Sequence, residues 1–80
     1  MVRKKVFTEV IVKYTMEGSK IPLCIIWEDG RKFKIDKVLD SRPAPLLRAG
    51  GQGMRYTCRI MGKDIYLWFE EGRWFVEGRV

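Results

Sequence analysis

Apolar and polar residues alternate along most of the chain, and this two-residue period is typical of β-strands. No stretch of useful length shows the period of a helix. The pattern predicts a first strand from about Arg3 to Thr15. Because successive side chains of a strand point to opposite sides, we expect its more apolar face to point inward. That face consists of Val6, Thr8, Val10, Val12 and Tyr14.

The clearest hairpin surrounds the turn Glu28-Asp29-Gly30. Asp-Gly is a strong turn signal, but it allows two registers. A two-residue loop would pair Ile26 with Phe33, whereas a three-residue loop would pair Ile25 with Phe33. We favour the three-residue loop, because it gives Gly30 the positive φ of a G1 bulge. It also gathers one apolar face from Leu23, Ile25, Phe33 and Ile35.

The region 41–53 interrupts the alternation with two prolines and three glycines. We expect a loop here, with at most one helical turn near residues 44–49 that begins after Ser41 and is closed by Gly50. A connection of this length in a small domain is typically a binding loop or a mobile segment. The sequence leaves both alternatives open.

The C-terminal third predicts a meander of three strands. Gly62-Lys63 fits a two-residue type II′ turn, because glycine stands at its first position. In that register the inward pairs are Ile60 with Ile65, Cys58 with Leu67 and Tyr56 with Phe69. The outward pairs are Arg59 with Tyr66 and Thr57 with Trp68.

The last strand follows the turn Glu70-Glu71-Gly72, and its orientation stays open. Either Trp74 and Val76 point inward, or Phe75 and Glu77 do. The sequence around this turn is similar to that around Glu28-Asp29-Gly30, which predicts the same turn chemistry in both places.

Together these elements predict an all-β fold of five to six short antiparallel strands in a single domain that spans residues 1–80. Closure into a small barrel or a strongly bent sheet would protect the edge strands of so short a chain. An SH3-like barrel is the first expectation, and an OB-like or other open β-roll is the second.

Two stretches carry a resemblance to known proteins. Residues 27–42, WEDGRKFKIDKVLDSR, followed by GGQGMRY at residues 50–56, resemble a group of short bacterial proteins, and the resemblance covers about Ile21 to Glu77. Because no activity is established for that group, it implies no catalytic or binding residues here. The Trp-x-Asp-Gly-x-x-Phe pattern of residues 27–33 is more loosely similar to Tudor and other SH3-like modules, which implies a small β-barrel.

Composition narrows the classes of function. The 80 residues are 46% hydrophobic and 32% charged, which is typical of a globular protein. Histidine is absent, which excludes a Ser-His-Asp triad, a Cys-His dyad and a His-ligated zinc site. The turn carboxylates of Glu28-Asp29 and Glu70-Glu71 are expected to be solvated, and no nucleophile has a base placed for it. We therefore expect no enzyme activity, no cofactor and no metal.

The cysteines and the N-terminus indicate a compartment. Cys24 and Cys58 lie 34 positions apart with no further ligand nearby, which favours two small apolar side chains over a metal site or a disulfide. The longest apolar runs have five residues, so we expect no membrane span. The apolar stretch after the basic start is broken at Glu9 and lacks a cleavage site, which argues against a signal peptide and for the cytoplasm.

Charge placement is the most suggestive feature for binding. The formal net charge is +6, and residues 41–63 carry five cations and no acidic residue. The predicted register puts Arg55 and Arg59 on the face of Tyr66 and Trp68. Cations for phosphates beside rings for bases suit single-stranded nucleic acid. The hypothetical nucleic-acid-binding residues are Arg42, Arg48, Arg55, Arg59, Lys63, Tyr66 and Trp68.

Two alternatives to nucleic-acid binding stay open. On an ordinary solvent-exposed face, Arg59 and Tyr66 form a cross-strand pair, and the last strand or the loop covers Trp68 and completes a second small core. A protein-interaction module would use a sheet edge or an SH3-like groove instead, with Trp27, Trp68 and Trp74 as anchors. The oligomeric state is not predicted.

Overall fold

The structure, a computed structural model, describes residues 3–46 and 51–79, and all regular secondary structure in them is β. The strands are β1 (Arg3–Tyr14), β2 (Lys20–Ile26), β3 (Lys32–Lys34), β4 (Lys37–Pro45), β5 (Gln52–Ile60), β6 (Lys63–Glu70) and β7 (Arg73–Arg79). The all-β prediction is confirmed. The described residues form seven strands, however, and not the five to six that were predicted.

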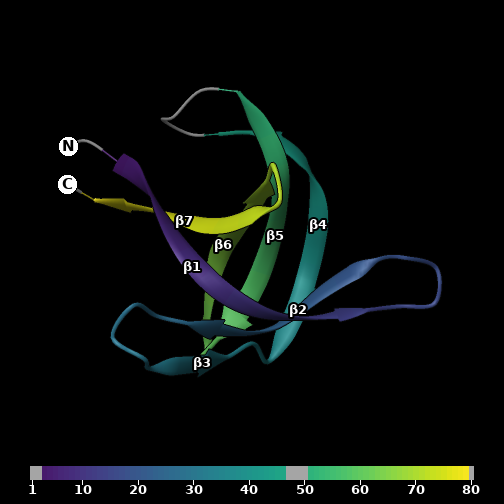
Figure 1. Cartoon of the computed structure of the whole chain (residues 1–80), viewed down its shortest axis with the longest axis horizontal. Helices are drawn as coiled ribbons and strands as arrows, with labels where there is room; N and C mark the ends of the chain where they lie inside the picture. The colour runs from purple at the N-terminus through teal and green to yellow at the C-terminus, as the bar shows by residue number, and fades with distance from the viewer. Residues whose placement is uncertain (1–2, 47–50, 80) are drawn as a thin grey trace.

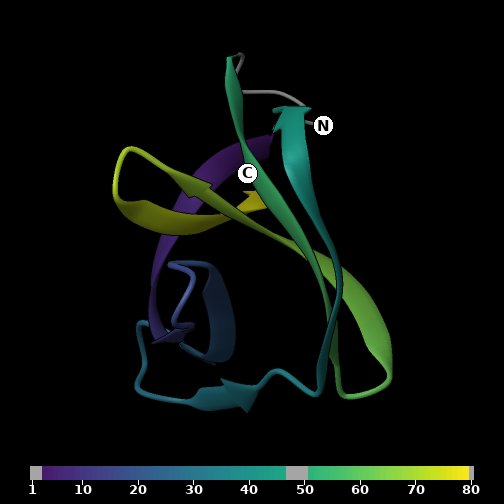
Figure 2. The ribbon, with the colours of Figure 1, turned by 90° about the vertical axis from the view of Figure 1, so that its right-hand side faces the viewer.

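All seven strands belong to one antiparallel sheet in the order β3-β2-β1-β7-β6-β5-β4. The first strand and the last strand lie side by side, because the first half of β1 pairs with β7 (Figure 1). The second half of β1 pairs with β2. The sheet curls into a half-barrel, as the side view in Figure 2 shows. Only Ile35 and Asp36 separate the edge strands β3 and β4, so this short corner draws the two edges toward each other. The Asp36 N–H donates to the Arg59 carbonyl of β5 at 2.8 Å and holds the corner in place.

The predicted 41–53 loop is wrong over most of its length. Residues 41–45 belong to β4, and β5 begins at Gln52. The predicted helical turn is also wrong at Ala44 and Pro45, which are part of β4, and residues 47–50 lie outside the described residues.

The prolines of this region fit a strand because β4 is an edge of the sheet. Hydrogen-bonded pairs alternate along antiparallel ladders. The hydrogen-bonded pairs can be counted from the turn between β5 and β6 across β5 to β4. This count places the backbone nitrogens of Pro43 and Pro45 on the side of β4 that faces away from β5. No neighbouring strand needs a donor on that side, so proline costs no ladder hydrogen bond there.

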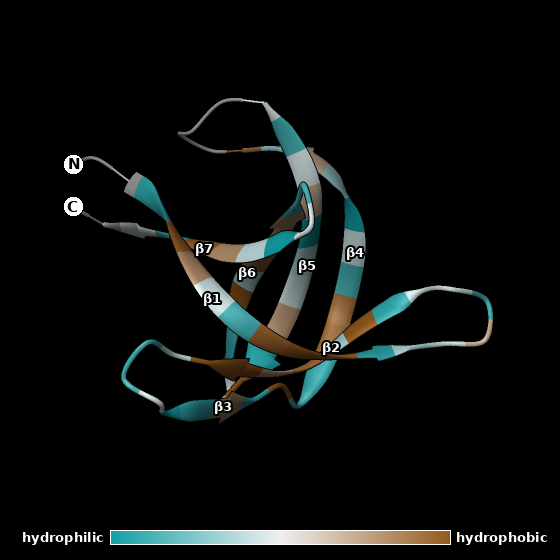
Figure 3. Cartoon of the chain, viewed as in Figure 1, coloured by the Kyte–Doolittle hydropathy of each residue, from teal (hydrophilic) through white to brown (hydrophobic). Residues whose placement is uncertain are grey.

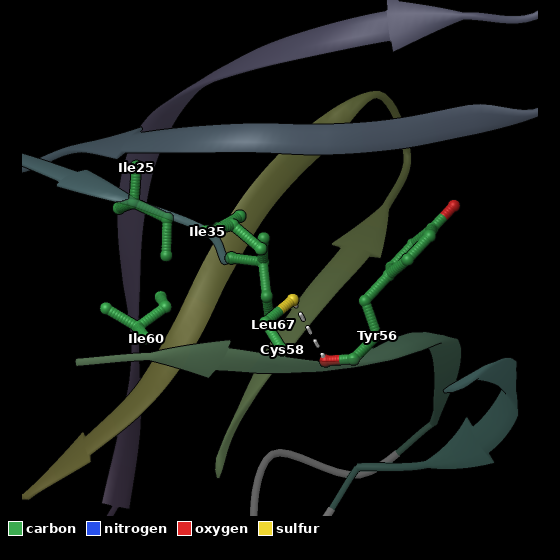
Figure 4. Close-up of a cluster of buried hydrophobic side chains, with 6 residues drawn as sticks. All are labelled: Ile25, Ile35, Tyr56, Cys58, Ile60 and Leu67. Carbon is green, nitrogen blue, oxygen red and sulfur yellow. Dashed lines mark hydrogen bonds between the residues drawn. The ribbon is translucent and has the colours of Figure 1, made fainter. Parts of the chain in front are cut away.

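The main core fills the concave side of the sheet. Its buried members are Ile25, Ile35, Tyr56, Cys58, Ile60 and Leu67, which converge from both halves of the chain in Figure 4. The inward face predicted for β5 is therefore confirmed. Both cysteines are free, and Cys58 is a core side chain, as expected.

The first hairpin follows the predicted inward face only in part. β1 and β2 are apolar at the centre of their pairing and carry polar residues toward its ends (Figure 3). The expected face of β1 is half-buried from Val6 to Val12. Tyr14, expected on that face, is exposed. Leu23 is exposed as well, because Ile11 pairs with Cys24 and Val12 with Pro22, which leaves Leu23 as the extra residue of a bulge.

A second, smaller core lies on the other face of β6 and β7, and consists of Ala44, Leu46, Trp68 and Phe75. The rings of Trp68 and Phe75 stack with their centroids 6.4 Å apart and an interplanar angle of 10°. Trp74 and Val76, on the opposite face of β7, pack against the main core. The last strand therefore packs apolar side chains on both of its faces. Trp74 and Val76 point to the main core, and Phe75 points to the second core, which decides between the two orientations that the sequence left open.

The turn after β2 has the predicted three-residue form. Gly30 has a φ of 89°, and its N–H donates to the Trp27 carbonyl at 2.8 Å. Ile25 pairs with Phe33, as the three-residue loop requires. Glycine is needed here because a side chain at this φ would be strained.

The turn between β5 and β6 differs from the prediction. Ile60 pairs with Lys63, so the two turn residues are Met61 and Gly62, with φ values of 52° and 77°. Two positive φ values define a type I′ turn, whose twist matches that of the flanking strands. The predicted type II′ turn at Gly62-Lys63 is therefore wrong.

The turn between β6 and β7 is also a two-residue turn, since Glu70 pairs with Arg73. Glu71 and Gly72 have φ values of 51° and 78°, again as in type I′. The prediction of the same turn chemistry here and at Gly30 is wrong, because the similar sequences close loops of different length.

Candidate functional site

The outer face of β5 and β6 carries four of the predicted nucleic-acid-binding residues. Arg55, Arg59, Tyr66 and Trp68 lie on the side opposite the main core, as the alternation predicted. Their partners differ from the predicted register by two positions, so Arg59 lies opposite Asp64 and Arg55 opposite Trp68. A shift of two positions keeps every side chain on its own face, whereas a shift of one would have moved all of them.

Trp68 is not available to stack on a base. It is only 1% exposed, because Phe75 of β7 lies against its ring and the end of β4 contributes Ala44 to the same cluster. This is the alternative in which the last strand and the 41–53 region cover Trp68 and complete a second small core. A residue with a stacking role must present its ring to solvent, so Trp68 leaves the candidate set.

Arg55 and Tyr66 form the part of the predicted surface that remains together. The guanidinium carbon of Arg55 lies 4.5 Å from the centroid of the Tyr66 ring, and Tyr66 is 44% exposed. The Nε of Arg55 is buried and has no hydrogen-bond partner. The pair therefore presents one aromatic ring at the surface, with a partly buried cation behind it.

The other arginines of the predicted set are held in ion pairs. Arg59 Nε donates to Asp64 Oδ1 at 3.0 Å, and Arg42 Nε donates to Asp40 Oδ2 at 2.8 Å. The hydrogen bond from Arg42 lowers the pKa of Asp40, and the bonds to Asp64 and Asp40 raise the pKa values of Arg59 and Arg42. Asp40 and Asp64, the carboxylates that flank the acid-free stretch 41–63, thus each pair with one of its five cations.

Two cations of the predicted set remain to be placed. Arg48 lies outside the described residues. Lys63 is exposed at the start of β6 and forms no ion pair with any described residue. Lys63 does not lie with Arg55 and Tyr66, because the register places it on the inward side with Ile60.

A groove opens beside β6 that the sequence analysis did not identify. It has a volume of about 650 Å³, within the range of about 300–1,000 Å³ that is typical of ligand sites. The ladder between β6 and β7 holds only three pairs, from Glu70–Arg73 to Trp68–Phe75. Beyond Trp68 the two strands diverge, as Figure 1 shows. The groove is lined by both strands, by the β2–β3 hairpin and by Ile60 and Met61 at the end of β5.

The groove is mostly apolar. Its aromatic residues are Trp27, Phe33, Tyr66 and Trp68, and its isoleucines are Ile25, Ile60 and Ile65. Arg31, Lys63 and Glu77 are the charged residues that line it. Tyr66 lines the groove and also lies under Arg55 on the outer face of β5 and β6, so the two candidate surfaces share this ring.

The divergence of β7 leaves backbone groups of β6 without a ladder partner. Alternation along the β5–β6 ladder directs the N–H and C=O groups of Asp64 and Tyr66 away from β5. The pairs between β6 and β7 do not reach either residue. The groove is therefore bordered by a stretch of strand edge within the sheet.

The two outer edges of the sheet offer no comparable template. β4 places Pro43 and Pro45 on its open side and carries a bulge between Val38 and Asp40. β3 has three residues, of which Lys32 and Lys34 are exposed. Proline, bulges, short length and lysine are all features that oppose edge-to-edge pairing.

The cationic side chains that line the groove differ in whether they form an ion pair. Arg31 Nε donates to Asp29 Oδ2 at 2.7 Å, and the backbone N–H of Arg31 lowers the pKa of Asp29 through a second hydrogen bond. Since both side chains are largely exposed, water screens this pair and it contributes little to stability. Lys63, without an ion pair among the described residues, is the cation most ready to meet an acidic group.

The remaining chemistry is sparse. Of the turn carboxylates, Glu70 accepts a hydrogen bond from Lys5 Nζ at 2.6 Å, whereas Glu28, Asp29 and Glu71 are exposed. Residues 3–46 and 51–79 contain no group of three acidic or cysteine side chains placed to hold a metal ion. They also contain no helix that could cross a membrane.

Comparisons with known proteins add no relative. No protein-family model matches the chain, and no curated protein or solved structure is significantly similar to it.

Proposed function

We propose that the protein is a small non-enzymatic binding module that takes an extended peptide segment into the groove beside β6. The observation that carries this proposal is the end of the β6–β7 ladder at Trp68, where the groove opens along the edge of β6. An extended peptide that pairs with this edge would satisfy the backbone groups of Asp64 and Tyr66. Its alternate side chains would point into the apolar groove, which adds hydrophobic burial to the hydrogen bonds.

The composition of the groove supports an apolar anchor on the peptide. Trp27, Phe33 and Tyr66 supply rings of the kind that dominate protein interfaces, and they surround isoleucine side chains rather than polar ones. The protected outer edges support the choice of β6, since Pro43 and Pro45 deny a partner the donors it would need on β4. The SH3-like assignment forms part of this proposal as a description of the fold alone, because SH3 domains bind polyproline II segments in their aromatic grooves, whereas the groove beside β6 offers a strand edge.

Single-stranded nucleic acid is the second candidate, and the Arg55–Tyr66 stack favours it together with the net charge of +6. Three observations weigh against it. Trp68 is buried, and Arg59 and Arg42 are engaged by acidic neighbours. A stacking surface then consists of one ring, whereas single-strand binding draws on several rings and free cations.

A two-dimensional NMR titration of the isotopically labelled protein tests the proposal. The probes are a capped peptide of sequence Val-Thr-Phe-Thr-Val and a short oligothymidylate, each added at low and at moderate salt. Peptide binding in the groove should shift the signals of Trp27, Phe33 and residues 63–67. Shifts that appear only with the oligothymidylate, centre on Arg55 and Tyr66 and weaken with salt would replace the proposal with the second candidate.

A pair of variants tests whether the peptide adds as a strand. Asp64→Pro and Asp64→Ala both remove the ion pair with Arg59, but only proline removes the N–H that faces the groove. Asp64 stands near the start of β6, where proline is best tolerated. Asp64→Ala should bind the peptide like the unaltered protein, and Asp64→Pro should lose about two- to tenfold in affinity, the value of one hydrogen bond. Equal affinity of the two folded variants would rule out strand addition at this edge.

A further inference from the structure

We infer that the preferred peptide carries an acidic side chain two positions from its apolar anchor, where it pairs with Lys63. This inference rests on the proposed function and names the chemistry of the partner. Lys63 lines the groove together with Ile65 and is the lining cation that no acidic side chain engages within the described residues. Arg31, the other cation of the groove, already has a carboxylate partner in Asp29.

The spacing of two follows from the register of β6. Lys63 and Ile65 lie on the same face of the strand, opposite Ile60 and Cys58 of β5. A strand added on the other side of β6 would place one residue opposite Ile65 and, two positions away, another opposite Lys63. Directly opposed side chains are the pairs that interact across strands, so the first is the anchor and the second is the acid. The spacing is the same for parallel and antiparallel addition, because side chains on one face of a strand recur every two residues in either direction.

The charge of the chain supports an acidic ligand over a second copy. At +6, two copies repel each other, whereas a segment with carboxylates is attracted. A carboxylate opposite Lys63 would also balance the lysine at a site where the nearest acidic residue of β6, Asp64, points to the other face and is bonded to Arg59. Asp64 is therefore not placed to satisfy Lys63 in the absence of a ligand.

Three capped peptides distinguish an effect of the spacing between acid and anchor from a general attraction of acidic peptides to the basic protein. Glu-Thr-Phe-Thr-Glu has acids two positions from the anchor on both sides, Thr-Glu-Phe-Glu-Thr has the same composition with the acids moved by one, and Lys-Thr-Phe-Thr-Lys reverses the charge. We expect the first to bind about two- to fivefold more tightly than the second, which is the effect of one exposed ion pair. We expect the third to bind most weakly.

A pair of variants assigns the effect to one lysine. Lys63→Glu and Lys13→Glu change the net charge equally, but Lys13 is an exposed residue of β1 that does not line the groove. Lys63→Glu should abolish the preference for the first peptide over the second, and Lys13→Glu should keep it. Both variants substitute exposed positions, so both should fold.

Each outcome has a distinct meaning. Equal affinity for the first and second peptides, or a preference that survives Lys63→Glu, would overturn the inference while leaving the proposed function intact. If none of these peptides nor Val-Thr-Phe-Thr-Val shifts the groove signals, the proposed function itself fails. Shifts of the Arg55 and Tyr66 signals by oligothymidylate alone would overturn both.

Discussion

Arg55 lies over the ring of Tyr66 at 4.5 Å, yet its Nε is buried without a hydrogen-bond partner. The two features oppose each other. A cation over an exposed ring contributes about 0.5–1 kcal/mol, whereas an unsatisfied buried donor costs about 1–3 kcal/mol. The guanidinium therefore adds little net stability, and the packing of its aliphatic stem carries what the side chain contributes.

Arg55→Met should leave the free energy of unfolding within about 0.5 kcal/mol of the unaltered protein or raise it, since methionine keeps the stem and removes the unsatisfied donor. Arg55→Ala should lose about 1 kcal/mol, because the stem no longer covers its neighbours. Urea unfolding followed by tryptophan fluorescence measures both. An equal loss in the two variants would show that the charge itself stabilises the fold.

Cys58 predicts a loss of stability in alkaline solution. Burial raises the pKa of its thiol from 9.0 to about 11, because the core disfavours the thiolate. Above pH 9 the unfolded chain releases this proton and the folded chain keeps it, so stability falls as the pH rises from 9 to 11. Relative to Cys58→Val, the unaltered protein should lose about 2–3 kcal/mol over this interval.

Urea unfolding of both proteins at pH values across that interval measures the difference. Thiol labelling gives an independent check, since Cys24 is only partly buried and should react first, and Cys58 should react only as the protein unfolds. Parallel pH profiles of the two proteins would contradict the assignment of the loss to Cys58.

The turn at Glu71-Gly72 can be improved. Glu71 has a φ of 51°, and nothing in its surroundings calls for glutamate, since the residue is exposed. Asn-Gly is the preferred pair for a type I′ turn, because asparagine tolerates this backbone conformation better than other residues with a side chain. Glu71→Asn should raise the free energy of unfolding by about 0.5–1 kcal/mol.

Glu71→Ala provides the control for this prediction, because it removes the same charge without the preference for positive φ. It should give no increase in the midpoint of thermal unfolding. An equal increase for alanine and asparagine would attribute the gain to charge rather than to turn conformation.

Pro43 and Pro45 should keep the protein from associating through β4. Replacing both with threonine restores two donors on the open edge and a side chain that favours strands. The double variant should form dimers or larger species at concentrations at which the unaltered protein does not, as measured by sedimentation velocity. A double variant with serine in place of Leu39 and Arg42, two exposed residues of β4, leaves the prolines in place and should sediment like the unaltered protein.

The local pattern predicted much of this architecture. Alternation identified the all-β class and the inward faces of β5 and of most of β1, because the two-residue period of a strand is encoded in each stretch by itself. The φ requirement of Gly30 also predicted the register of the β2–β3 hairpin correctly. The face shared by Arg55 and Tyr66 was predicted correctly even though the predicted turn before β6 was wrong. The register error was of two positions, and such an error leaves every side chain on its own face.

Tertiary structure decided which of these faces is free. Trp68 is hidden by Phe75 and by the end of β4, segments whose contact with it depends on the order of strands in the sheet. Pro43 and Pro45 indicated a loop because the sequence does not show that β4 is an edge. The groove exists because β7 leaves β6 after three pairs to follow β1. Alternation is a property of neighbouring residues, whereas edges, coverage and grooves arise from contacts between strands that are distant in the chain, and only the fold specifies those.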